Sequence, residues 1–125
     1  MINKVILIGN LGSDPEIVNL SNNKIYIRIK IVTVSFWKNI KTQELDKRIE
    51  WHQIVLYNNI IFIKKYLKKG SQVYVEGFLK TDVFKKNDNL IFFTKIICNN
   101  IILLSNENKK KSFFLLKRPI NKILL

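Results

Sequence analysis

The chain has 125 residues, of which 47% are hydrophobic and 25% charged, a composition that supports one packed domain and excludes an intrinsically disordered chain. Its formal net charge of +13 and its isoelectric point near 10.0 indicate a polyanionic partner. A single cysteine excludes an internal disulfide and fits a reducing compartment, and no apolar run reaches the ~18 residues of a membrane span.

The N-terminal segment is a run of β-branched residues that ends in glycines. Lys4–Ile8 predicts a strand buried on both faces, and Gly9-Asn10-Leu11-Gly12 predicts a tight bend after it. A phosphate-binding loop is not expected here, because the third glycine, the lysine and the following helix of that motif are missing. Asp14-Pro15 predicts a turn, and Glu16–Leu20 predicts a short strand.

The segment Lys24–Phe36 alternates between apolar and polar positions. Its odd positions are largely isoleucine, whereas its even positions include Lys24, Tyr26, Arg28 and Lys30. We therefore expect one face to join the core and the other to be basic. A basic face is often only solvated, and contact with a polyanion is the alternative for Arg28 and Lys30.

Trp37–Arg48 breaks this alternation and carries both charge signs, which predicts a solvated hairpin loop. Trp37 lies at the root of that loop beside Lys38 and Lys41, where a core position is difficult. The sequence therefore indicates an exposed tryptophan among cations.

Ile49–Tyr57 alternates again, with Trp51 and Tyr57 on one face and His52 on the other. Aromatic side chains in a strand usually fill a core. Aromatics set among Lys and Arg also form platforms for single-stranded nucleic acid, and the net charge favours this second interpretation. His52 is expected to be a structural or subunit-contact histidine.

The second half of the chain predicts one helix and one hairpin. Ile60–Lys69 has helical spacing and is followed by Gly70, which is typical of a helix end. Gln72–Leu79 and Leu90–Ile97 predict paired strands, with a turn at Lys86–Asn89 and a bulge at Gly77. Phe84 lies near the tip of this hairpin between Lys80, Lys85 and Lys86.

The sequence offers no constellation for catalysis. One histidine and one cysteine cannot form a conventional metal site, and the carboxylates are scattered, so we expect neither an enzyme nor a cofactor or metal. Cys98 lies in the apolar run Thr94–Leu104, where a small buried hydrophobe is expected rather than a reactive thiol.

Three stretches together resemble the bacterial and organellar single-stranded DNA-binding protein family: Asn3–Glu16, Glu50-Trp51-His52 and Lys69–Gly77. The resemblance extends from Asn3 to about Leu104. It implies an all-β fold, a five-stranded OB-fold barrel with one short α-helix between the third and fourth barrel strands. It also implies a homotetramer that binds and protects single-stranded DNA without reading its sequence, during DNA replication, recombination and repair. The expected location is cytoplasmic, at a bacterial nucleoid or an organellar genome.

The resemblance also indicates which residues contact DNA. Trp37 and Phe84 match positions of stacking aromatics in the family, with Phe84 standing where Trp is more common. Base stacking is expected on Trp37, Trp51, Tyr57 and Phe84. Phosphate neutralisation is expected from Arg28, Lys30, Lys38, Lys41, Lys69, Lys80, Lys85 and Lys86.

Two other functions remain compatible with the residues. An RNA-binding OB-fold module of the cold-shock or translation-factor type would use the same aromatic and basic side chains. A primosome-type interaction protein, in which binding of nucleic acid is secondary, is the alternative from a different class.

The C-terminal segment differs from the rest of the chain, and we expect the domain to end at Leu104. Residues 105–125 carry six basic residues and one acid, Glu107, together with several large apolar residues. They lack the acidic tip through which bacterial family members commonly recruit partners, so that recruitment is expected to be absent. Pro119 interrupts any helix, and the tail is expected to be disordered or to form a short amphipathic segment.

Overall fold

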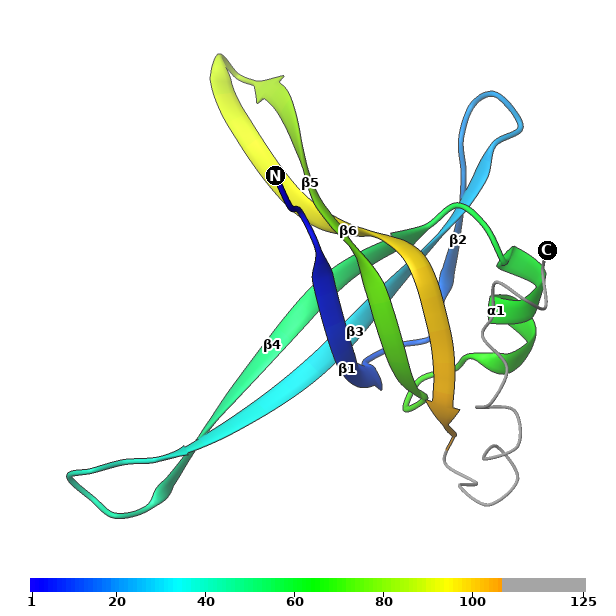
Figure 1. Cartoon of the computed structure of the whole chain (residues 1–125). Helices are drawn as coiled ribbons and strands as arrows, with labels where there is room; N and C mark the ends of the chain where they lie inside the picture. The colour runs from blue at the N-terminus through cyan, green and yellow to red at the C-terminus, as the bar shows by residue number, and fades with distance from the viewer. Residues whose placement is uncertain (107–125) are drawn as a thin grey trace.

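The computed structural model describes residues 1–106, and the predictions for the tail beyond Asn106 lie outside the described residues. The elements are β1 (Val5–Leu11), β2 (Glu16–Asn19), β3 (Ile25–Lys38), β4 (Leu45–Leu56), α1 (Ile60–Tyr66), β5 (Gln72–Lys86) and β6 (Asn89–Ser105). Figure 1 shows a small barrel from which two long hairpins project, both pointing away from α1.

The barrel closes through five of the six strands. The strands are hydrogen-bonded in the order β1-β5-β6-β4-β3, and β3 returns to β1 at Asn10 and Leu11, while β2 adds to the free side of β3. All pairings are antiparallel except the one between β4 and β6. With α1 between β4 and β5, the third and fourth barrel strands, this architecture confirms the predicted OB-fold barrel.

Alternation along the strands builds the core. Ile27, Ile29 and Ile31 of β3 are fully buried and point inward, so their even-numbered neighbours point outward. Each such side chain contributes about 1.5–3 kcal/mol to folding when it leaves water. Phe62 and Ile63 of α1 join this cluster and close one end of the barrel.

The prediction that β1 is buried on both faces is wrong. Ile6 and Ile8 are more than half exposed, whereas Leu7 packs against the core and Leu11 is buried. A barrel strand presents only one face to the interior, and no element among residues 1–106 covers the outer face of β1 at these positions.

The β3–β4 hairpin is longer than the sequence predicts, because strand pairing continues to Lys38 and Leu45 and leaves only residues 39–44 as the turn. The Asn39 side chain organises this turn by accepting the Lys41 N–H at 2.9 Å and donating to Asp46 at 2.9 Å. Both faces of the projecting hairpin meet solvent, so its strands carry no apolar alternation. The predicted loop over Trp37–Arg48 was for this reason too long.

The β5–β6 hairpin and its turn are confirmed, although the strands reach further than predicted, to Lys86 and from Asn89. The two turn residues, Asn87 and Asp88, both have positive φ, as a two-residue turn of type I′ requires. The register shifts at Gly77, which confirms the predicted bulge. A Cβ atom at this position would collide with the Ile97 carbonyl oxygen, so only glycine fits.

Helix α1 ends earlier than predicted. Tyr66 is its last residue, Leu67 is already extended with φ −96° and ψ 136°, and Gly70 takes its φ of 91° in the bend before β5. The Leu67 side chain is buried in the core together with Phe62 and Ile63 of the helix. No helix within residues 1–106 is both long and apolar enough to cross a bilayer.

Candidate nucleic-acid interface

The outer face of β3 and β4 carries the predicted basic strand face. Opposite residues of an antiparallel pair share a face, and Arg28 lies opposite Val55, Lys30 opposite Gln53 and Val32 opposite Trp51. Trp51 therefore shares its face with Arg28 and Lys30. We call this surface the outer face, and we extend the name to residues of the same orientation on β6 and β5.

The far edge of the Trp51 six-membered ring lies against the barrel wall at Gly12. A Cβ atom at Gly12 would collide with the six-membered ring of the indole, and it would lie 3.0 Å from a methyl group of Val32. Gly12 thus leaves room for the indole to rest against the backbone, and 56% of the Trp51 surface remains exposed. The distal edge of the indole is thus packed, while more than half of the side chain is accessible to a base.

Tyr57 follows directly after β4 and contacts Tyr26 of β3, with ring centroids 5.9 Å apart and planes tilted by 50°. Tyr57 is about half exposed. The sequence does not predict Tyr26 as a residue of the nucleic-acid interface. Its even position in β3, shared with Arg28 and Lys30, is the signal that could have identified it.

Phe84 lies on the β5–β6 hairpin and is half exposed. Its face includes Lys80, opposite Lys95, and Lys86, opposite Asn89. Lys85 points to the other face of the hairpin, where it lies opposite Leu90, and its Nζ atom is 3.9 Å from Asp88. The hairpin therefore brings Lys80 and Lys86 to the side of Phe84 but not Lys85.

Trp37 occupies the opposite face of the β3–β4 hairpin from Trp51. It lies in the odd series of β3, opposite Asp46, and the Arg48 guanidinium lies 5.3 Å above the centre of its ring. This cation–π contact holds the ring and brings a cation that sequence reasoning missed. A nucleic acid that contacts both tryptophans must pass around an edge of this hairpin.

His52 lies on the face opposite Trp51, as predicted, and its Nε2 atom is 2.8 Å from the Thr33 hydroxyl. This hydrogen bond ties β4 to β3 at the point where the hairpin leaves the barrel. The geometry fits a structural histidine.

The remaining predicted cations are dispersed. Arg28 donates to Glu16 at 2.6 Å, and this hydrogen bond lowers the pKa of the Glu16 carboxyl. To bind a phosphate, Arg28 must give up its contact with the Glu16 carboxylate. Lys38 ends β3 on the outer face, and Lys41 lies in the turn beyond it. Lys69 lies in the bend after α1, where its backbone N–H donates to Asp14 at 2.8 Å.

The described residues offer no clustered ligands for a metal ion. Within residues 1–106 there is no cluster of three or more histidine, cysteine, aspartate or glutamate side chains that could hold a metal. Burial raises the pKa of the Cys98 thiol to about 12, and its sulfur donates to the Asn100 carbonyl at 3.3 Å. The thiol is therefore protonated at neutral pH and a poor nucleophile.

A five-stranded OB-fold barrel with exposed aromatics and cations along one outer face defines a class of proteins suited to binding single-stranded nucleic acid. Residues 2–104 match the Single-strand binding protein family, and the chain belongs to this family.

One relative, a protein of Rickettsia typhi named single-stranded DNA-binding protein, is 42% identical over 90 residues, which cover 70% of this chain and 58% of the relative. The match thus spans less than two thirds of the relative's length. Among solved structures, the chain is similar to the Plasmodium falciparum SSB in complex with ssDNA, with a TM-score of 0.74 and 38% identity. That similarity covers 84% of this chain and 96% of the other. The family that the motifs suggested is thereby confirmed.

Proposed function

We propose that this protein binds and protects single-stranded DNA without reading its sequence, during replication, recombination and repair. The observation that carries the proposal is the position of Trp51, Tyr57 and Phe84 as exposed aromatics on the outer face, beside lysine and arginine side chains. The name of the Rickettsia typhi relative and the ssDNA in the Plasmodium falciparum complex support the choice of DNA.

Binding would combine two physical terms. Bases stack on the aromatic rings, and because every base has a π-face this term tolerates any sequence. Lysine and arginine neutralise phosphates and release counterions, which makes the affinity dependent on salt. Neither term involves a chemical step, so we propose a binding protein rather than an enzyme, located with DNA at a bacterial nucleoid or an organellar genome.

We further propose that the chain acts as a homotetramer. Its subunit contact would use the barrel surface formed by β1 and the part of β5 that pairs with it, Gln72–Gly77. Ile6 and Ile8 are exposed there, opposite Glu76 and Tyr74. β1 pairs with β3 only at its C-terminal end, so over most of its length one edge has no partner strand among residues 1–106.

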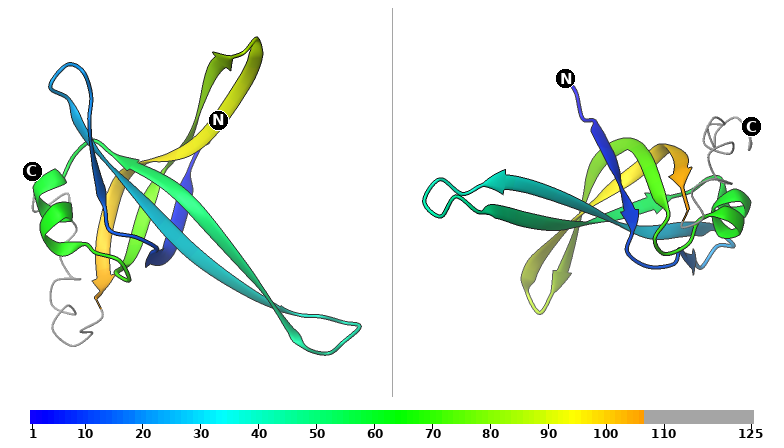
Figure 2. Two further views of the ribbon diagram at one scale, coloured as in Figure 1. Left: turned by 180° about the vertical axis from the view of Figure 1, so that it is seen from behind. Right: turned by 90° about the horizontal axis from the view of Figure 1, so that it is seen from below.

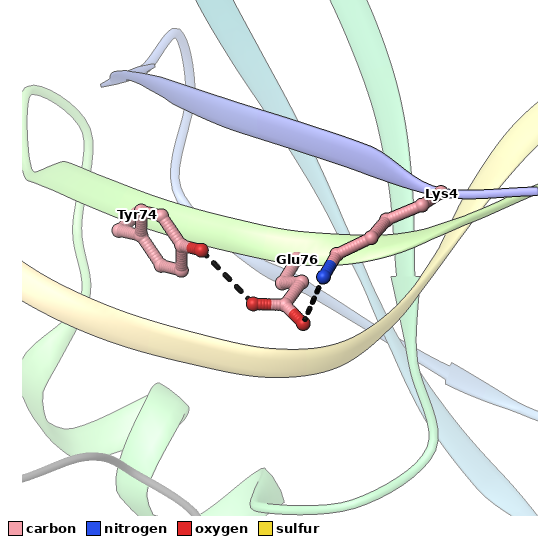
Figure 3. Close-up of polar contacts among 3 residues, drawn as sticks. All are labelled: Lys4, Tyr74 and Glu76. Atoms are coloured by element: carbon pink, nitrogen blue, oxygen red, sulfur yellow. Dashed lines mark hydrogen bonds and ion pairs between the residues drawn. The ribbon is translucent and has the colours of Figure 1, made fainter.

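A hydrogen-bonded cluster crosses this surface. Glu76 accepts the Tyr74 hydroxyl at 2.9 Å and pairs with the Lys4 ammonium at 3.3 Å, as Figure 3 shows. The Tyr74 hydrogen bond, followed by Lys4, lowers the pKa of the Glu76 carboxyl. An apolar surface with a preorganised polar centre supports contact with another copy of the chain.

The experiment that tests DNA binding is a titration of fluorescently labelled oligo(dT) monitored by anisotropy. Unlabelled oligo(dT), unstructured RNA of equal length and duplex DNA then compete for the protein. We expect only the single-stranded DNA to displace the probe at equal concentration. Displacement by the RNA would favour an RNA-binding module instead, and absence of any binding would leave the interaction-protein alternative. Light scattering of the same samples gives the mass of the assembly.

A further inference from the structure

The two faces of the β5–β6 hairpin differ in what they join. In the barrel, Val75 of β5 and Ile96 of β6 point into the core. Every second residue counted from them along each strand therefore continues the inner face onto the hairpin. The alternate residues continue the outer face, and Phe84 is one of them. Figure 2 shows this hairpin leaving the barrel in a direction of its own, separate from the β3–β4 hairpin.

Phe93 of β6 belongs to the outer face as well. It lies opposite Asp82, whereas Phe84 lies opposite Ile91, so the two phenylalanines are diagonal neighbours across the strand pair. Diagonal neighbours are about 7–8 Å apart and within reach of aromatic side chains. Phe93 is 46% exposed, close to the 50% of Phe84, so both rings are accessible to solvent.

The charges around these rings favour a polyanion. Lys80 and Lys86 share the face with Phe84 and Phe93. Asp82, the acidic residue on the same face, is held by Lys95 at 2.7 Å, and this hydrogen bond lowers the pKa of the Asp82 carboxyl. The carboxylate that would repel phosphate is thus already neutralised by a neighbouring lysine.

The same lysine links the hairpin to the rest of the outer face. The hydrogen bond to Asp82 raises the pKa of Lys95, and the proximity of Tyr57 and Tyr26 raises it further. On β6, Lys95 stands between Phe93 of the hairpin and Ile97, which pairs with Val55 of β4 in the barrel. The outer face of β6 thus runs from the barrel onto the hairpin.

We propose that Phe93 is a further base-stacking residue and forms with Phe84 a platform for neighbouring bases on the β5–β6 hairpin. This inference rests on the proposed function and deepens it. A single phenyl ring offers less surface than an indole, and a second ring beside it restores the stacking area at this part of the interface.

Phe92 provides a matched control. It is the same residue type, adjacent in sequence and 65% exposed, but it lies opposite Val83 on the other face of the hairpin. If aromatic residues only stabilise the hairpin or attract DNA nonspecifically, Phe92 and Phe93 should behave alike. If Phe93 stacks on bases, only its loss should weaken binding.

The test measures oligo(dT) affinity by anisotropy at fixed salt for Phe93→Ala, Phe92→Ala and Trp51→Ala. Phe93→Ala should weaken binding roughly 5- to 150-fold with an unchanged salt dependence, because no phosphate contact is lost. Phe92→Ala should stay within about twofold of the unaltered protein. Phe93→Trp should restore binding, and circular dichroism should show folded variants. If Phe93→Ala unfolds, Phe93→Leu keeps the apolar packing and should still lose affinity.

Equal effects of Phe93→Ala and Phe92→Ala would overturn this inference, as would an unchanged affinity of a folded Phe93→Ala protein whose Trp51→Ala counterpart is weakened. Failure of the proposed function looks different, because the unaltered protein would then not bind oligo(dT) at all.

Discussion

Replacing Trp51 by alanine tests the outer face most sharply, because this residue combines an exposed ring with a fixed position over Gly12. If the indole stacks on one base, its loss removes about 1–3 kcal/mol of binding free energy, which is a 5- to 150-fold increase in Kd. The covered part of the side chain, on the order of 100 Å², contributes at most about 3 kcal/mol to folding, so a lower Tm is also expected.

The two effects can be separated by a milder substitution. Trp51→Phe keeps an aromatic ring on the outer face and should bind oligo(dT) with an affinity between those of the unaltered protein and Trp51→Ala. Anisotropy gives the affinities, and thermal unfolding followed by circular dichroism identifies the temperature range in which each variant is folded. An unchanged affinity of folded Trp51→Ala would refute the assignment of this face to DNA.

Further outcomes follow from other parts of the molecule. The logarithm of affinity should fall with the logarithm of salt by about 0.7 per neutralised phosphate, and a slope near zero would exclude the basic surface as the determinant. His52→Ala should disturb folding or assembly, because it loses the hydrogen bond to Thr33, and lost DNA affinity in a fully assembled variant would mean that the faces are wrongly assigned. A carboxyl with a lowered pKa stabilises the fold above its ordinary pKa of 4.5, and this stability is lost as the pH falls through the lower value in the folded protein. The Tm of Glu76→Gln should therefore depend less on pH below about 4.5 than that of the unaltered protein, and identical profiles would contradict this linkage. Deleting residues 107–125 keeps Asn106, which accepts a hydrogen bond from Ser71, and should leave the barrel intact. Because the charges of the deleted residues are mainly basic, DNA affinity should stay constant or fall slightly, and tighter binding would contradict this expectation.

The barrel could be predicted from the sequence where one side of a strand is buried. In β3 the apolar alternation identifies the core face. In β4 the alternation leaves open which face is buried, and the common orientation of Trp51 and Arg28 follows from the strand pairing. The same signal is absent where both faces meet solvent. For this reason the sequence predicts a loop at Trp37, and only the strand pairing shows that Trp37 lies on the face opposite to Trp51.

The role proposed for Phe93 could not be predicted for a related reason. Phe92 and Phe93 are adjacent, both exposed and equally apolar, so composition does not distinguish them. Only the register with β5 assigns one to each face, and that register depends on the two-residue turn and on the bulge at Gly77. The sequence does not predict the exposed outer side of β1, because a short apolar run has the same pattern whether one face of the strand or both are buried.

The central claim, that exposed aromatics stack on the bases of single-stranded DNA, is tested most directly by tryptophan fluorescence of the unaltered protein during titration with oligo(dT). Both tryptophans, Trp37 and Trp51, are exposed, so bases have access to their rings. Stacking should quench the fluorescence in a saturable manner, at the same DNA concentrations at which anisotropy reports binding. Saturated binding with unquenched fluorescence would contradict the account.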